Sequence, residues 1–171
     1  VTVLGEENVK GLNRPFVIVS NHASHLDAPL IFGSMPRKIS RYVAAGAAAD
    51  YFFDVWWRKG LTSLFFNAFP VDRIGLRGRH GLATSLLDDG VPLLLFPEGT
   101  RSRTGEMGAF KPGAAALCIS RDVPCLPVAI VGASEAMPYG QNWRSRGRLP
   151  VFVVFGEPMR AEDGETVVQF S

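Results

Sequence analysis

The 171-residue chain is poor in the residue types that build metal sites and disulfide frameworks. It has three histidines and two cysteines, Cys118 and Cys125. The number and spacing of the cysteines match neither a zinc site nor a disulfide framework. We therefore expect both cysteines to be buried like small apolar residues, in a protein that works in a reducing, cytoplasmic setting.

Targeting and membrane-spanning segments are also missing from the sequence. No signal peptide opens it, and no apolar run approaches the ~18–20 residues that cross a membrane. The first residue is valine rather than methionine, and the final residues, GETVVQFS, show no closing element. We expect residues 1–171 to form a single domain excised from a longer chain.

The charge of the chain is nearly balanced, with a formal net value of +2, so nucleic acid is not an expected partner. Fourteen of the 18 basic residues are arginine and four are lysine. Arginine suits phosphate and carboxylate ligands because its planar guanidinium donates two parallel hydrogen bonds. A GC-rich genome would produce the same bias.

Strand and helix patterns alternate along the chain, and 47% of the residues are hydrophobic, enough for a sizeable core. We predict strands at 15–20, 39–43, 68–73, 91–96, 124–132 and 149–156, and helices at 27–35, 44–66, 78–89 and 111–121. The run VPLLLF at 91–96 is apolar throughout, as in a parallel sheet covered on both faces. The expected fold class is α/β, with a mostly parallel central sheet flanked by helices. Ligands of such sheets bind beyond the carboxyl ends of the strands, so the polar residues there are candidate site residues.

The segment NHASHLD, which follows the first strand, places Asn21, His22 and His25 ahead of Asp27. If Asp27 begins a helix, His22 lies in the preceding turn and its imidazole can fold over the helix start. His25 is only two positions from Asp27, and helical neighbours two apart point away from each other. We therefore expect Asp27 to fix the tautomer of His22 and leave its second ring nitrogen as a base. The alternative is a helix cap surrounded by polar residues.

The spacing His-x-x-His-x-Asp also resembles that of metallo-hydrolases, which need further ligands from later loops. The only other histidine of the chain is His80, in the segment GLRGRHG. We therefore expect no metal, and a metallo-hydrolase is retained only as an alternative.

A second polar segment, FPEGTRSRTG, follows the strand at 91–96. Gly99 allows a close approach of the backbone to a ligand, and Arg101 and Arg103 flank Ser102. Exposed amides together with arginines form a cradle for an anion, in which Glu98 can bind a hydroxyl or hold an arginine. The alternative is a solvated loop with an internal Glu–Arg pair. The segment lacks the ending of a P-loop, and the chain has no Gly-x-Ser-x-Gly nucleophile elbow.

Four segments in order, NHASHLD, FPVDR, FPEGTRS and VPCLPVAI, resemble the four sequence blocks of the glycerolipid acyltransferase family. The best-known members of that family are lysophosphatidate and glycerol-3-phosphate acyltransferases. The resemblance covers about residues 17–130, and four blocks in order are far more specific than one. It implies a glycerol-3-phosphate acyltransferase-like fold.

The resemblance also implies a reaction. His22, oriented by Asp27, would act as general base on a hydroxyl that attacks the thioester of acyl-CoA or acyl carrier protein. No acyl-enzyme and no cofactor are needed. Asn21 would position the loop or donate to the oxyanion, and His25 has no implied role. The glycerophosphate or lysophospholipid acceptor would be bound by Arg73, Glu98, Gly99, Thr100, Arg101 and Ser102.

Contact with a membrane is suggested by the aromatic segment at 51–66. The basic run RSRGR at 144–148 suits an anionic lipid, an acidic carrier protein or a solvated loop. The aromatic segment suits core packing, an acyl-chain groove or a surface in the lipid headgroup zone. We expect a cytoplasmic enzyme with peripheral contact at the inner face of the cell membrane. The alternatives are an acyltransferase for another acceptor, such as a sugar lipid or a natural product, and a non-catalytic module that binds lipid or an acyl carrier.

Overall fold

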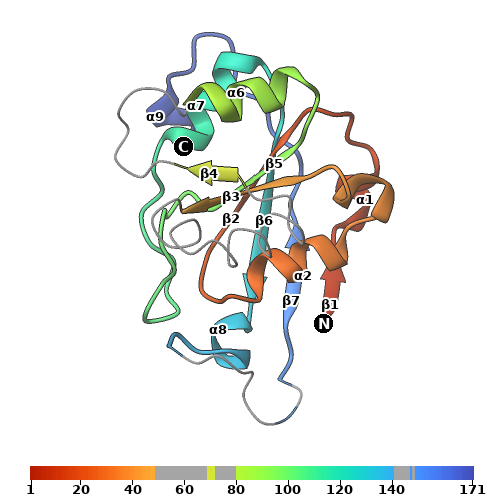
Figure 1. The fold of residues 1–171 in the computed structure, drawn as a ribbon, viewed down its shortest axis with the longest axis vertical. Coiled ribbons are helices and arrows are strands. Elements are labelled where there is room, and N and C mark those ends of the chain that lie inside the picture. The colour runs from red at the N-terminus through yellow and green to blue at the C-terminus, as the bar shows by residue number, and fades with distance from the viewer. Residues whose placement is uncertain (49–68, 72–79, 141–146, 148) are drawn as a thin grey trace.

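The computed structural model describes residues 1–48, 69–71, 80–140, 147 and 149–171. The strands of this part form one sheet in the order β1-β7-β6-β2-β5-β3-β4 (Figure 1). Neighbouring strands are parallel except for β6 and β7, which are antiparallel. The predicted α/β class with a mostly parallel sheet is confirmed. The strands are β1 (Thr2–Leu4), β2 (Val17–Ser20), β3 (Ala44–Ala48), β4 (Phe69–Val71), β5 (Leu93–Leu95), β6 (Cys125–Val131) and β7 (Phe152–Phe155).

Alternate residues of the central strands point to opposite faces of the sheet and build two separate cores. Ile18 and Leu94 belong to the core beneath α1 (Glu6–Lys10), α2 (Asp27–Ser34) and α3 (Arg37–Ser40). Val17 and Leu93 belong to the core beneath α6 (His80–Asp88) and α7 (Gly113–Arg121), which α9 (Val167–Phe170) borders. Burial on both faces explains why consecutive residues of these short strands, such as Val17 and Ile18 or Leu93 and Leu94, are apolar. The remaining helix, α8 (Ala133–Ala136), directly follows β6.

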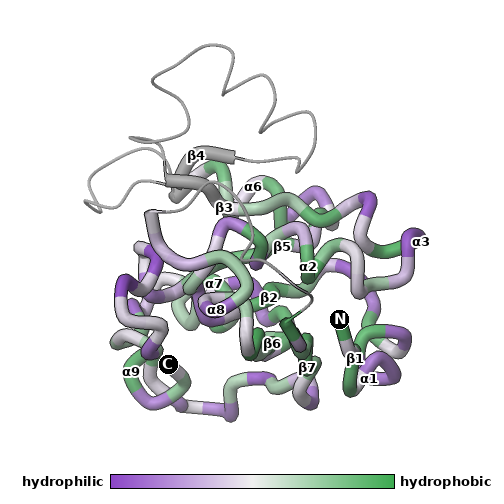
Figure 2. The backbone as a smooth tube through the Cα atoms, turned by 90° about the horizontal axis from the view of Figure 1, so that it is seen from below, coloured by the Kyte–Doolittle hydropathy of each residue, from purple (hydrophilic) through white to green (hydrophobic). Residues whose placement is uncertain are grey.

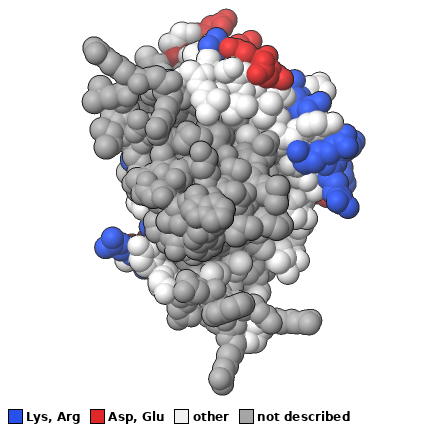
Figure 3. Space-filling view, in the orientation of Figure 1, with Lys and Arg blue, Asp and Glu red and all other residues white. Residues whose placement is uncertain are grey.

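Hydropathy follows this layering, since the apolar residues gather on the central strands and the polar ones on the outer turns (Figure 2). Phe16 and Phe155 are the largest fully buried side chains. A side chain of this size stabilises the fold by roughly 1.5–3 kcal/mol when it leaves water. Both cysteines are buried and unpaired, as predicted. On the face shown in Figure 3, the described basic side chains lie mainly along the edge that carries α1.

The predicted strand at 39–43 is wrong, because residues Arg37–Ser40 form helix α3 and the next strand begins at Ala44. The amides of Ile39 and Ser40 both donate to the carbonyl of Pro36, which starts the helical turn. The buried residues Ile31, Met35, Ile39 and Val43 recur every four positions, a helical rather than a strand period.

The predicted helix at 44–66 is wrong at its start, where Ala44–Ala48 form β3. This strand pairs with β5 on one side and β4 on the other. Pairing inside the sheet outweighs the helix propensity of alanine, because propensity is a weak preference that tertiary contacts override. The rest of the predicted helix lies outside the described residues.

The remaining predictions agree with the structure to within a few residues, but both ends of the chain contain elements that we did not predict. Strand β1 and helix α1 open the chain, and α9 closes it. Helix α9 begins with a capping box, in which Thr166 accepts from the Gln169 amide and the Gln169 side chain accepts from the Thr166 amide. In the part of the chain that the structure describes, no helix has the length and apolar character needed to span a bilayer.

Candidate active site

Three central strands, β2, β5 and β6, end at the same edge of the sheet because they run parallel. Asn21 and His22 directly follow β2, the segment at 96–102 follows β5, and α8 follows β6. Two of the predicted polar clusters are therefore brought together at this edge. The third, which contains Arg73, lies outside the described residues.

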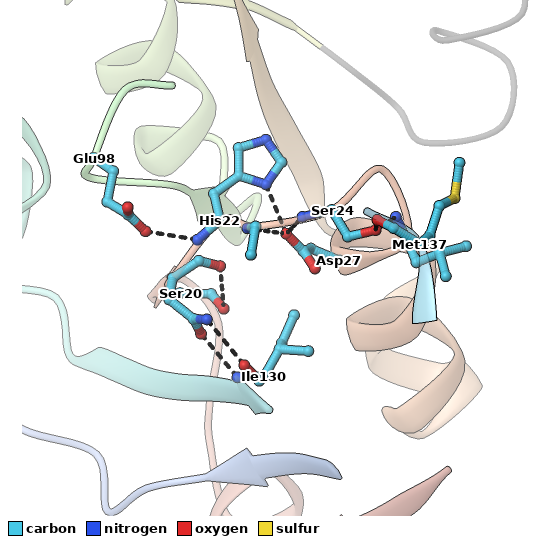
Figure 4. Close-up of polar contacts among 10 residues, drawn as sticks. Ser20, His22, Ser24, Asp27, Glu98, Ile130 and Met137 are labelled. Atoms are coloured by element: carbon cyan, nitrogen blue, oxygen red, sulfur yellow. Dashed lines mark hydrogen bonds and ion pairs between the residues drawn. The ribbon is translucent and has the colours of Figure 1, made fainter. Parts of the chain in front are cut away.

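His22 and Asp27 form a hydrogen-bonded pair, with 2.8 Å between Nδ1 of the imidazole and Oδ2 of the carboxylate (Figure 4). Oδ2 also accepts from the backbone amides of Ala23 and Ser24, each at 2.8 Å. Asp27 is the first residue of α2 but does not cap it, since its carboxylate reaches back to the preceding turn. The turn therefore wraps around the carboxylate, and His22 is the residue that the turn delivers to it.

The Asp27 carboxylate is fully buried. Its second oxygen, Oδ1, has no hydrogen-bond partner among the described residues. Three donors stabilise the negative charge of the Asp27 carboxylate at Oδ2, namely the two backbone amides and the imidazole Nδ1–H. A carboxylate in this position fixes the Nδ1–H tautomer and stabilises the imidazolium when the other nitrogen takes up a proton.

The imidazole of His22 is itself held flat against Phe96, with ring centroids 4.0 Å apart and planes inclined by 18°. Its side chain is 22% exposed, so one edge meets solvent. Nε2 points away from Asp27 and has no hydrogen-bond partner among the residues described (Figure 4). This nitrogen is placed to accept a proton from a bound ligand.

The backbone of His22 is bonded on both sides to the loop that follows β5. The His22 amide donates to Oε1 of Glu98 at 2.7 Å, and the Ser102 amide donates to the His22 carbonyl at 2.7 Å. Oε2 of Glu98 accepts from the Gly108 amide at 2.8 Å. Glu98 is only 8% exposed and both of its oxygens accept backbone hydrogen bonds. This geometry favours a role in positioning the loops over direct contact with a substrate.

The side chain of Asn21, for which the sequence suggests loop support or donation to the oxyanion, is bonded to β6. Its side-chain amide donates to the Ile130 carbonyl at 2.9 Å and its oxygen accepts from the Ile130 amide at 2.8 Å. This two-bond contact ties the end of β2 to β6. Loop support is therefore the role that the geometry of Asn21 favours, because both ends of its amide are already bonded within the protein.

Gly99 has a left-handed backbone, with φ of +73°, and Lys111 lies against it. A Cβ built on Gly99 would lie 2.7 Å from Nζ of Lys111, so only glycine fits without displacing the lysine. Thr100 is exposed, whereas Arg101 is half-buried. Sequence reasoning assigned no role to Lys111 or Tyr139. The ring centroid of Tyr139 lies 4.9 Å from Cζ of Arg101.

His25 is half-buried beside the pair and bonds to neither member in the structure. Burial, followed by the nearby positive charge of Arg101, lowers the pKa of His25 below its ordinary value. Among the residues that the structure describes, no three His, Cys, Asp or Glu side chains come together as metal ligands would. The described part of the site therefore consists of the His22–Asp27 pair and the loop that carries Arg101 and Arg103, called the basic loop below.

Comparison with known proteins agrees with the sequence blocks. The family model described as Acyltransferase matches residues 1–131. A 1-acyl-sn-glycerol-3-phosphate acyltransferase of Chlamydomonas reinhardtii is 30% identical over 156 residues, which cover 90% of this chain and 45% of the relative. An enzyme of the same name from Pseudomonas aeruginosa is 29% identical over 164 residues, covering 94% of this chain and 59% of the relative.

The fold has a solved counterpart in the 1-acyl-sn-glycerophosphate acyltransferase PlsC of Thermotoga maritima. The two structures match with a TM-score of 0.72 and 28% sequence identity, over 96% of this chain and 62% of the other. The chain thus spans about half the length of the curated relatives that it matches. The resemblance in the four blocks is confirmed over most of the chain, which belongs to the acyltransferase family.

Proposed function

We propose that this chain transfers a fatty acyl group from a thioester, acyl-CoA or acyl carrier protein, to a hydroxyl of a lysophosphatidate-like acceptor. The observation that carries the proposal is the His22–Asp27 pair, whose second imidazole nitrogen has no hydrogen-bond partner among the described residues and lies near the loop bearing Arg101. The names of the relatives support the same reaction, since each acts on 1-acyl-sn-glycerol 3-phosphate.

In the proposed reaction, Nε2 of His22 takes the proton of the acceptor hydroxyl while the oxygen attacks the thioester carbonyl. A C–O bond forms and the carbonyl becomes a tetrahedral oxyanion. The intermediate then collapses, the C–S bond breaks, and the imidazolium returns its proton to the leaving sulfur. Asp27 stabilises the imidazolium between these two steps. No side chain is acylated, so no Ser or Cys nucleophile is required.

The loop at 96–102 supplies the acceptor site in this proposal. Arg101 pairs with the phosphate of the acceptor, because a guanidinium binds phosphate oxygens through two parallel hydrogen bonds. Arg73 has the same role by resemblance to the family. Glu98 and Ser102 hold the loop against His22 through its backbone. Since a lysophospholipid resides in a bilayer, the proposal includes peripheral contact with the inner face of the cell membrane.

The test uses His22→Ala and Asp27→Asn, assayed with a radiolabelled acyl thioester and 1-acylglycerol 3-phosphate. We expect His22→Ala to lower kcat by about 10²- to 10⁴-fold, the range that general-base catalysis contributes. Asp27→Asn lowers it for the same reason, because the imidazole loses its orienting charge. Circular dichroism verifies that both variants remain folded.

The matched control is His25→Gln, which changes the neighbouring histidine and leaves the pair intact. We expect its kcat to stay close to that of the unaltered protein. A folded His22→Ala variant with undiminished transfer would rule out the proposed base. Transfer only to acceptors that carry no phosphate would rule out the proposed acceptor.

A further inference from the structure

Tyr139 lies beyond α8, outside the four sequence blocks, yet its ring meets the basic loop of the site. We propose that Tyr139 is a positioning residue, which holds the guanidiniums of Arg101 and Arg103 near its ring and leaves their N–H groups available for the phosphate of the acceptor. The inference rests on the proposed function and adds to it a residue that sets acceptor affinity.

The contact involves two guanidiniums and one ring. Cζ of Arg101 lies 4.9 Å from the ring centroid of Tyr139, and Cζ of Arg103 lies 5.6 Å from it. Both distances fall within the ~6 Å reach of a cation–π interaction. Among the described residues, neither arginine has a carboxylate partner. Within the described part of the chain, the ring is therefore the contact that the two positive charges share.

An aromatic partner has a chemical advantage at a phosphate site. A carboxylate neighbour would occupy the N–H groups of a guanidinium through a bidentate pair. A ring attracts the guanidinium through its π electrons and offers no carboxylate oxygens to its five N–H donors. Two guanidiniums over one ring suit a phosphomonoester, which carries nearly two negative charges. The Tyr139 hydroxyl is not needed for this role, whereas the ring is.

The backbone leading to Tyr139 is anchored to the turn that carries the His–Asp pair. The hydroxyl of Ser24 donates to the Met137 carbonyl at 3.1 Å, and the Ser24 amide donates to Asp27 (Figure 4). At the start of the segment, Gly132 adopts φ of +85°, where a Cβ would overlap the Pro150 carbonyl. These contacts fix the position of the Tyr139 segment relative to His22. The Tyr139 ring in turn positions Arg101 and Arg103.

The experiment compares Tyr139→Leu with Tyr139→Phe, which keeps the ring and removes only the hydroxyl. Tyr139 is 44% exposed, so neither substitution disturbs the core. We expect Tyr139→Leu to raise the KM for 1-acylglycerol 3-phosphate by roughly 5- to 30-fold, the loss of two cation–π contacts. The KM for the thioester and kcat change little. Tyr139→Phe retains the low KM for the acceptor.

Acceptor binding is also measured without chemistry, by calorimetric titration of glycerol 3-phosphate into the His22→Ala protein. Tyr139→Leu in that background weakens binding by the same factor, and Tyr139→Phe does not. Combining Tyr139→Leu with Arg101→Ala and Arg103→Ala adds no further loss to that of the arginine variants. Equal affinity of the Leu and Phe variants, or equal rises in the donor and acceptor KM, would overturn the inference. Absence of acyl transfer by the unaltered protein would overturn the proposed function instead, and the titration would still decide the role of Tyr139.

Discussion

Single residues at the site divide into those that face a ligand and those that hold others in place. The direction of side chains around a helix start was sufficient to pair Asp27 with His22 rather than His25, and the structure has this pairing. Glu98 was not predictable in the same way. Its two backbone partners, the amides of His22 and Gly108, lie 76 and 10 positions away. Only the fold brings them together.

Replacing Glu98 by glutamine tests whether this residue positions the loops. The amide has one acceptor instead of two, so one backbone N–H in a nearly buried site loses its partner. We expect a loss of about 1–3 kcal/mol in the free energy of unfolding, measured by urea denaturation. A lower kcat accompanies it because the His22 backbone is no longer held.

Glu106→Gln serves as the control, since Glu106 is exposed in the same loop and its substitution leaves stability unchanged. If Glu98→Gln kept full stability and raised only the KM for the acceptor, Glu98 would contact the substrate directly.

Among the elements, those buried on both faces were predicted well. The strands at Val17–Ser20 and Leu93–Leu95 are short and apolar except for Ser20, a pattern that depends only on local sequence. Strand Ala44–Ala48 was misread because alanine and glycine fit either element, and its pairing with β5 and β4 decides the outcome. Strand β7 lies within the predicted strand at 149–156, but its antiparallel pairing with β6 was not predicted, since no local pattern records the direction of a neighbour.

The joint between β2 and β6 depends on Asn21, and its replacement by alanine is expected to loosen the site. Both hydrogen bonds to Ile130 are lost, which lowers the free energy of unfolding by about 1–3 kcal/mol. We also expect kcat to fall, because Asn21 precedes the base directly. Thermal unfolding and steady-state kinetics measure the two effects.

Asn8→Ala is the matched control. Its amide donates to the carbonyl of Phe155 at 3.0 Å, on β7, which β6 separates from β2. This variant is expected to lose stability without losing kcat. Equal kinetic effects of the two substitutions would mean that Asn21 acts on stability alone.

At the scale of the whole molecule, the chain begins at one edge of the sheet and returns to that edge near its end, where β1 pairs with β7. Gly5 makes the corner between β1 and α1, with φ of +70°. A Cβ at this position would overlap the carbonyl oxygen of Phe155. The α/β class could be predicted from alternation, but this closure could not, because it joins segments about 150 residues apart.

Gly5→Ala is expected to destabilise the molecule by at least ~2 kcal/mol, from the left-handed backbone and the overlap together. Gly11→Ala is the matched control, since a Cβ there meets no atom within 4 Å and the backbone is helical. We expect the free energy of unfolding of Gly11→Ala to stay within about 0.5 kcal/mol of that of the unaltered protein, with any change more often a rise than a fall. Urea denaturation of the two variants measures the difference, and equal stability would show that β1 contributes little to the fold.

The hydrogen bonds between the loop and His22 engage only the backbone amide and carbonyl of His22. These bonds do not depend on the side chain at that position, and an imidazole analogue keeps a ring to stack on Phe96. Residue 22 can therefore be exchanged for an unnatural imidazole analogue of altered basicity while the neighbouring loop stays in place. A series of such analogues would relate the rate to the basicity of one atom, which separates proton transfer from every other contribution to the reaction.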